Sequence, residues 1–169
     1  MANYLEAFYF LIDNDEFSEY QNFDDFSKNL KESVEYFHVQ SRNAWFSYAL
    51  SKLLHASGQE GELKFLTEAR NYDELSLITS DLFEKIISEI NKLILWCRNN
   101  PSEVSVILKY NCEPHIILEA INNIKVFTDE LNSWGGERLD ILFAYLKKII
   151  EFIHQAENKQ QFIIYITNM

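Results

Sequence analysis

The sequence predicts an all-α fold, a compact single-domain bundle of about six to eight helices around a long central helix at residues 73–100. Within this stretch apolar residues recur at steps of three and four, which places them in one stripe along a helix. Only four Gly and two Pro supply turns, too few for an all-β fold. The 13 Phe, 9 Tyr and 3 Trp among 169 residues provide a core large enough for one helical domain, residues 1–169. The stripe consists of Leu75, Ile78, Leu82, Ile86, Ile90, Leu93 and Cys97.

The N-terminal third reads as helical. Residues 2–12 are apolar nearly all round and predict a short buried helix, with a strand as the alternative. After a polar break at 13–15, helical spacing predicts a helix over 22–37 and resumes over 44–57, as one bent helix or two. Gly58 marks the end of this pattern, because glycine commonly follows a helix C-terminus.

The long helix is flanked by shorter elements. Residues 62–70 predict a short helix, and Asp73 is the expected cap of the long helix. Pro101 ends the long helix, since proline cannot continue the hydrogen-bond ladder. Residues 101–112 fit a helix or a strand, and we favour a short helix.

Two helices are expected in the C-terminal third. Pro114 opens the first, which runs to Trp134. The second is expected at 137–155. The tail, residues 160–169, is either a last helical turn or a small strand.

The charge excludes one class of function. The formal net charge is −11, and residues 1–37 hold nine acids against two lysines. Proteins that bind nucleic acid need clustered Lys and Arg to release counterions from the phosphates, so direct nucleic-acid binding is not expected. A surface rich in carboxylates instead suits a basic protein partner.

The cysteines and the apolar segments indicate a cytoplasmic protein. Cys97 lies in the long stripe and Cys112 lies near a loop, as expected of two buried free thiols rather than a disulfide framework. The N-terminus has no basic leader and no cleavage site. No run reaches the roughly 18 apolar residues of a membrane span, so no membrane association is expected.

No recognisable catalytic or metal-binding motif is present, and we therefore expect no enzyme, no cofactor and no metal. Cys112 and His115 form the nearest pair of metal ligands, and a single pair falls short of a metal site. His38, His55 and His154 are scattered singly. The Gly-x-Ser-x-Gly, His-Glu-x-x-His and phosphate-binding-loop motifs are absent.

Residues 42–47, Arg-Asn-Ala-Trp-Phe-Ser, resemble the start of the Arg-x4–6-His motif of helical HEPN-type ribonucleases. The resemblance would imply a ribonuclease whose arginine and histidine share one helix. The sequence departs from the motif, because positions 47, 48 and 49 are Ser, Tyr and Ala. The first histidine is His55, about two helical turns too late, so the activity is not carried over.

Residues 13–26 interleave acids with aromatic residues. One interpretation is the entry of an amphipathic helix, with aromatics inside and acids facing water. The other gives the acids a basic surface to cover, because carboxylates steer association with a positively charged active site and occupy the place of phosphates. On the second interpretation the predicted partner-binding residues are Asp13, Asp15, Glu16, Glu19, Tyr20, Asp24 and Asp25.

These observations together predict a non-catalytic acidic inhibitor that acts by binding a protein. In size and charge the chain resembles bacterial immunity proteins, the antitoxins of bacterial competition that neutralise a cognate nuclease toxin by covering its basic active-site surface. Two alternatives are a phage-type inhibitor of a nucleic-acid-targeting defence system, and an enzyme or small-ligand binder with a pocket between helices.

Overall fold

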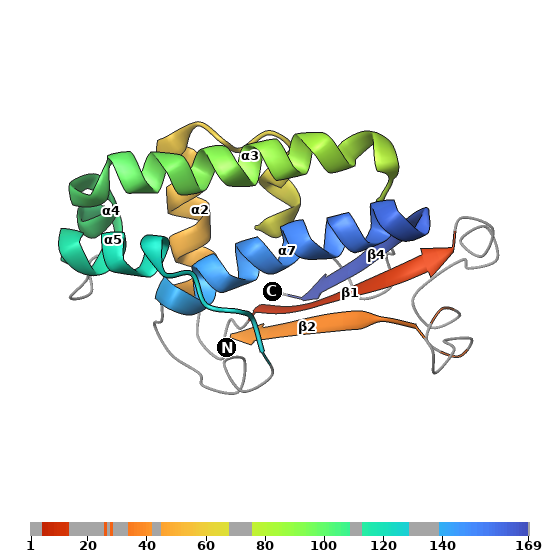
Figure 1. Ribbon diagram of the computed structural model, residues 1–169. Coiled ribbons are helices and arrows are strands. Elements are labelled where there is room, and N and C mark those ends of the chain that lie inside the picture. Colours follow the sequence, from red (N-terminus) through yellow and green to blue (C-terminus); the bar gives the residue numbers. More distant parts are fainter. Residues whose placement is uncertain are drawn as a thin grey trace.

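The computed structural model describes residues 5–13, 26, 28, 34–41, 45–67, 76–108, 113–128 and 139–168. The elements whose bounds are described are five α-helices, one 3-10 helix and four β-strands (Figure 1). The fold is mixed α/β, so the prediction of an all-α bundle is wrong. The helices are α2 (Trp45–Ser57), the 3-10 helix η2 (Glu62–Leu66), α3 (Ser80–Asn99), α4 (Pro101–Leu108), α5 (Pro114–Asn122) and α7 (Leu139–Lys159).

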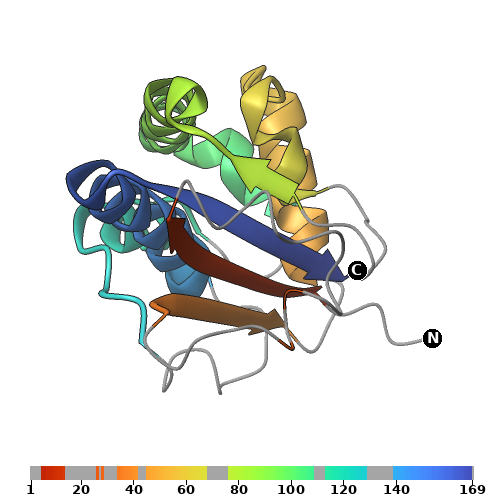
Figure 2. The ribbon, with the colours of Figure 1, turned by 90° about the vertical axis from the view of Figure 1, so that its right-hand side faces the viewer.

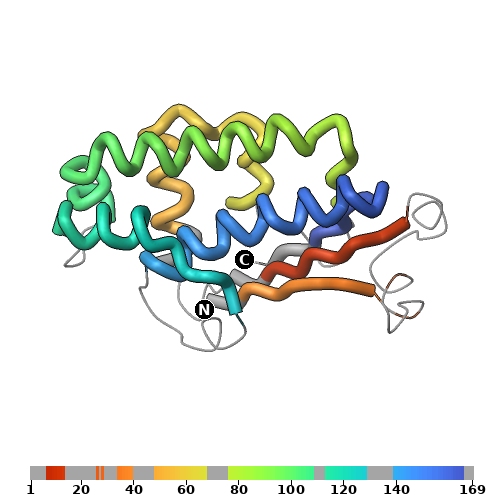
Figure 3. The backbone as a smooth tube through the Cα atoms, viewed as in Figure 1, coloured from red at the N-terminus to blue at the C-terminus, as the bar shows by residue number. Residues whose placement is uncertain are grey.

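The four strands form one antiparallel sheet in the order β2-β1-β4-β3. They are β1 (Leu5–Asp13), β2 (Tyr36–Ser41), β3 (Ser76–Ile78) and β4 (Gln161–Asn168). The central pair joins β1 to β4, so segments from opposite ends of the chain lie side by side (Figure 3). In the turned view of Figure 2, α3 and α7 lie on the same side of the sheet.

Strand β1 explains why the helix predicted for residues 2–12 is wrong. Ala7, Tyr9 and Leu11 lie in the main core, whereas Phe10 and Ile12 lie in a second apolar cluster. Because successive side chains of a strand point to opposite faces, both faces of β1 are apolar. A strand buried on both faces reads as a continuous apolar run, and its two-residue period is hidden. The strand alternative for this segment is therefore the correct one.

The C-terminal strand β4 is also buried on both faces. Ile163 and Tyr165 of β4 belong to the main core, and Ile164 between them belongs to the second cluster. Here too the strand alternative is confirmed.

Two of the predicted helices give residues to the sheet. Tyr36 and Phe37, expected at the end of the helix over 22–37, begin β2, although Phe26 and Lys28 are helical. Residues 76–78, expected inside the central helix, form β3 and pair with β4. Both strands pair with segments far away in sequence, which local periodicity does not reveal.

The remaining helices agree better with the sequence. α2 and α4 confirm the helices expected at 44–57 and after residue 101. Pro114 opens α5 as expected, but this helix ends at Asn122 and not at Trp134. α7 confirms the last predicted helix and extends it to Lys159. The helix expected at 62–70 is the shorter 3-10 helix η2.

The most deeply buried helix is α7, not the predicted central helix. Twelve of the 21 residues of α7 are buried, compared with six of the 20 residues of α3. α7 packs against both α3 and β4 and lies between α3 and the sheet (Figure 1). The stripe predicted for α3 is buried as expected at Ile86, Ile90, Leu93 and Cys97. It covers one side of α7 and does not form the centre of a bundle.

None of the helices in the described ranges is long and apolar enough to cross a membrane.

Candidate functional site

Of the seven predicted partner-binding residues, only Asp13 belongs to the part of the chain that the structure describes. It is the last residue of β1 and is exposed, and its Oδ1 accepts a hydrogen bond of 2.8 Å from Nε2 of Gln161. Asp15, Glu16, Glu19, Tyr20, Asp24 and Asp25 lie outside the described residues.

The acid-rich connection between β1 and β2, residues 13–35, begins and ends at one corner of the sheet. Asp13 pairs with Gln161 in the sheet register. At the other end of the connection, the backbone oxygen of Glu35 accepts a hydrogen bond of 2.9 Å from the Leu11 N–H. Nζ of Lys159 donates to Oε1 of Glu35 at 2.6 Å. The two ends of the connection therefore contact the last residue of α7 and the first residue of β4.

These two surface contacts fix position more than they add stability. The side chains of Lys159 and Glu35 are 46% and 52% exposed, and such ion pairs are worth about 0–1 kcal/mol. Lys159 closes α7, where a cation interacts favourably with the helix dipole. The corner holds the first and last acids of the connection on the same side of the molecule.

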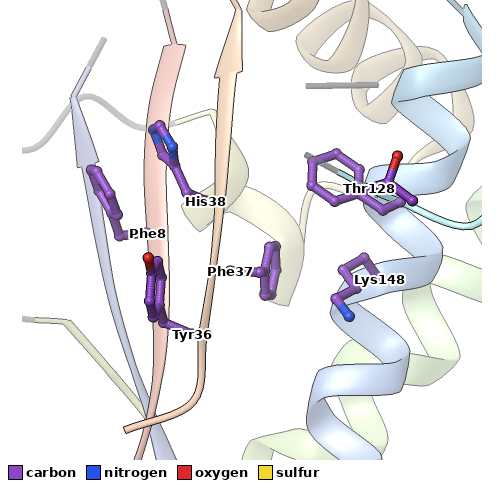
Figure 4. Close-up of a pocket in the computed structure, with 7 residues that line it drawn as sticks. Phe8, Tyr36, Phe37, His38, Thr128 and Lys148 are labelled. Carbon is purple, nitrogen blue, oxygen red and sulfur yellow. The ribbon is translucent and has the colours of Figure 1, made fainter. Parts of the chain in front are cut away.

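A hollow of about 780 Å³ lies around β2, and its lining was not predicted from the sequence. Because β2 is a strand, Tyr36 and His38 point to one face of the sheet and Phe37 points to the other. Figure 4 shows this arrangement, with Phe8, Tyr36 and His38 on one side of β2 and Phe37 and Lys148 on the other. The lining residues are Phe8, Tyr36, Phe37, His38, Phe127, Thr128 and Lys148.

The first side of the hollow is aromatic. Phe8 and His38 are paired across β1 and β2, and their rings stack with centroids 4.1 Å apart and an angle of 8° between the planes. The ring of Tyr36 stacks on Phe10 with centroids 5.8 Å apart, and Tyr36 is 61% exposed. An exposed tyrosine beside a stacked pair is the kind of surface that binds apolar side chains in protein interfaces.

The second side of the hollow combines aromatic rings with a cation. Phe37 packs edge-on against Phe127 and Phe152, at centroid distances of 6.1 and 4.9 Å. Nζ of Lys148 lies 5.9 Å from the Phe37 ring centroid and 4.0 Å from Oε2 of Glu151. The Lys148 side chain is 23% exposed, and its ion pair with Glu151 is at the long end of the range for such pairs. This side therefore favours a negatively charged group.

A buried tyrosine pair lies beneath the hollow. The hydroxyl groups of Tyr9 and Tyr145 are 2.5 Å apart, and they join β1 to α7. Burial raises the pKa of Tyr9 and of Tyr145 well above the usual value, so both phenols stay protonated even at a pH at which an exposed tyrosine ionises. We interpret this pair as a structural contact.

A second hollow of about 370 Å³ lies between β3 and η2. Phe65 and Tyr165 line it, with ring centroids 4.9 Å apart. Nearby, a carboxylate oxygen of Glu89, Oε2, is buried and has no hydrogen-bond partner among the described residues. Neither hollow lies between helices alone, in contrast to the pocket that the sequence suggested.

The residues considered for metal binding and for ribonuclease activity are only partly described. His115 is exposed and lies 3.2 Å from Glu113, whereas Cys112 is outside the described ranges. No group of three or more His, Cys, Asp or Glu suited to a metal occurs among the described residues. Arg42 is also outside these ranges, and His55, in the last turn of α2, is exposed and contacts Glu60 at 2.9 Å.

Comparisons of this chain with protein-family models, with curated proteins and with solved structures gave no match.

Proposed function

We propose that this chain is a non-catalytic inhibitor that binds a basic protein partner through the acid-rich connection 13–35. The observation that carries the proposal is the corner at the end of α7, where Asp13 and Glu35 anchor both ends of the connection. Residues 13–35 hold eight acids and two lysines. The described ends of this acid-rich segment, Asp13 and Glu35, are both attached at this one corner.

Such a segment supports inhibition of a protein that acts on nucleic acid. A nuclease binds phosphates with a positively charged surface, and carboxylates compete for the same surface. Within this class, we propose an immunity protein that neutralises a nuclease toxin. A phage-type inhibitor of a nucleic-acid-targeting defence system would also cover a basic surface with carboxylates, and only the identity of the partner would differ.

Charge reversal tests the surface directly. The test variant replaces Asp13, Asp15, Glu16 and Glu19 with Lys. A matched control replaces the exposed acids Glu84, Glu103, Glu119 and Glu157, which lie on α3, α4, α5 and α7, with Lys. Each variant changes the formal net charge from −11 to −3, so the two differ only in where the charge changes.

The partner is isolated from host extract on the immobilised wild-type chain, and association is followed by biolayer interferometry over a range of NaCl concentrations. We expect the test variant to associate at least about tenfold more slowly at low salt and to lose most of the salt dependence, because steering acts on the association rate. The control should change the rate by less than about threefold. Equal effects of the two variants would refute the proposed surface.

Inhibition is tested separately from binding. The isolated partner is assayed for cleavage of double-stranded DNA and of RNA, with and without a stoichiometric amount of the chain. We expect the wild-type chain to abolish cleavage, and the charge-reversed variant to require a higher concentration. A partner without nuclease activity, or one that cleaves equally well when saturated with the chain, would contradict the inhibitor function.

A further inference from the structure

The hollow around β2 extends over both faces of the sheet. β2 lies at one edge of the sheet, and among the described strands it pairs only with β1. The rings of Phe8, Tyr36 and His38 border the hollow on one side of the β2 backbone, and Lys148 borders it on the other (Figure 4). A ligand that fills the hollow must therefore reach both sides of an edge strand.

We propose that this hollow binds an extended segment of a protein, which lies along β2 and places an apolar side chain beside Tyr36 and an acidic side chain beside Lys148. Successive side chains of an extended chain point in opposite directions, so neighbouring residues of one segment reach both sides of the strand. A small rigid molecule reaches only one side, because the β2 backbone lies between them. Addition of a segment beside an edge strand is also a recurrent mode of peptide recognition.

The aromatic side of the hollow determines which kind of side chain the bound segment places beside Tyr36. Tyr36 is 61% exposed, and Phe8 and His38 are half-buried. The stacked Phe8–His38 pair holds its rings in a fixed orientation, so an arriving apolar side chain finds a preformed surface. This side therefore favours an aliphatic or aromatic residue.

The side of the hollow at Lys148 determines the second side chain of the bound segment. Within the described residues its nearest carboxylate is that of Glu151, at 4.0 Å, the outer limit of an ion pair. A carboxylate brought into the hollow can approach Nζ more closely than Glu151 does, and the opposite charges attract. The segment is thus expected to alternate apolar and acidic residues.

The probe is a fluorescein-labelled, amidated nine-residue peptide in which valine alternates with glutamate, and binding is measured by fluorescence anisotropy. One comparison peptide carries lysine in place of glutamate, and another has the same composition with all valines in one block. The net charge of −11 attracts the lysine peptide non-specifically. Tighter binding of the glutamate peptide therefore reports a local contact. Because no basic partner is involved, the result is independent of the proposed inhibition.

Matched variants locate the contact. Lys148→Met keeps most of the apolar stem and removes the charge, and its control is Lys147→Met on the exposed side of α7. Tyr36→Ala removes the exposed ring, and its control is Tyr48→Ala, a tyrosine of α2 that is 40% exposed. Thermal unfolding verifies that each variant is folded.

We expect the alternating glutamate peptide to bind at least about tenfold more tightly than either comparison peptide, and Lys148→Met and Tyr36→Ala each to weaken it by at least about fivefold. The two controls should change binding by less than about twofold. In amide NMR spectra, the peptide should shift resonances of residues 36–41 and 126–128.

Four results would overturn the proposal. The first is no saturable binding of the glutamate peptide up to about 1 mM. The second is an equal loss of binding in the controls. The third is binding of 1-naphthoate, a small aromatic anion, with the same dependence on Lys148 while the peptide fails to bind. The fourth is a dimer in light scattering that Tyr36→Ala dissociates, since the hollow would then be the contact between two copies.

Discussion

The hydrogen bond between Tyr9 and Tyr145 offers a quantitative test of how the sheet is joined to α7. The two hydroxyl groups lie 2.5 Å apart, and the side chains are each 1% exposed. Tyr9→Phe removes one hydroxyl and leaves the other buried without this partner. The expected loss is about 1–3 kcal/mol in the free energy of unfolding, the cost of a buried polar group that loses its hydrogen bond. For a chain of this size each kcal/mol corresponds to a decrease in Tm of about 2–4 °C.

The double variant distinguishes the hydrogen bond from simple loss of packing. Tyr9→Phe combined with Tyr145→Phe removes both hydroxyl groups, so neither is left buried without the other. We therefore expect the double variant to be destabilised by no more than the worse single variant, with a coupling energy of at least about 0.5 kcal/mol. Urea unfolding followed by circular dichroism measures all four members of the cycle. The matched control is Tyr36→Phe, whose ring is 61% exposed and whose effect should stay within about 0.5 kcal/mol.

Two outcomes would refute this reasoning. If Tyr9→Phe changes the free energy of unfolding by less than the control, the hydroxyl contact contributes no net stability. If the two single effects add in the double variant, the hydroxyl groups do not act as a pair, and the contact between β1 and α7 rests on ring packing alone.

Two further predictions follow from single residues. Burial raises the pKa of the Cys97 thiol from its usual 9.0 to about 12. Above pH 9 the unfolded thiol loses its proton while the folded thiol keeps it, so stability should fall by up to about 1.4 kcal/mol per pH unit. Urea unfolding at pH 8 and pH 10 should show a loss about 1 kcal/mol larger in wild type than in Cys97→Ala, and equal losses would argue against a buried thiol. Gly58 follows α2 with a φ of 71°, a conformation that side chains with a Cβ rarely adopt. Gly58→Ala should therefore lower the free energy of unfolding by about 1 kcal/mol, and Gly58→Asn by less, whereas equal stability of all three would contradict a left-handed turn.

The sequence determined the local features of the helices. The steps of three and four apolar residues place Ile86, Ile90, Leu93 and Cys97 on the buried side of α3. Gly58 and Pro114 correctly mark an end and a start, because their backbone restrictions act within a few residues. The net charge and the cluster of acids near the N-terminus are also read directly from the sequence, and the hypothesis of a basic partner depends on them.

Fewer features of the candidate site could be predicted from the sequence. Asp13 could be identified from sequence as part of an acidic segment, but its neighbour Gln161 could not, since the contact depends on the pairing of β1 with β4. The lining of the β2 hollow was missed because Tyr36 and Phe37 continue the helical spacing of the preceding residues. The only local sign of a strand was the high aromatic content around residues 8–10 and 36–38, and such residues fit a buried helix equally well.

Sequence alone thus indicated the buried stripe of α3, the end of α2 before Gly58 and the start of α5 at Pro114, and it determined that the net charge is strongly negative. Tertiary structure alone decided that residues 5–13 and 161–168 are strands, that 76–78 leave the long helix, and that α7 is the buried helix. The physical reason is that a strand obtains its hydrogen bonds from a partner elsewhere in the chain. When both of its faces are buried, no alternation of polar and apolar residues remains to reveal it.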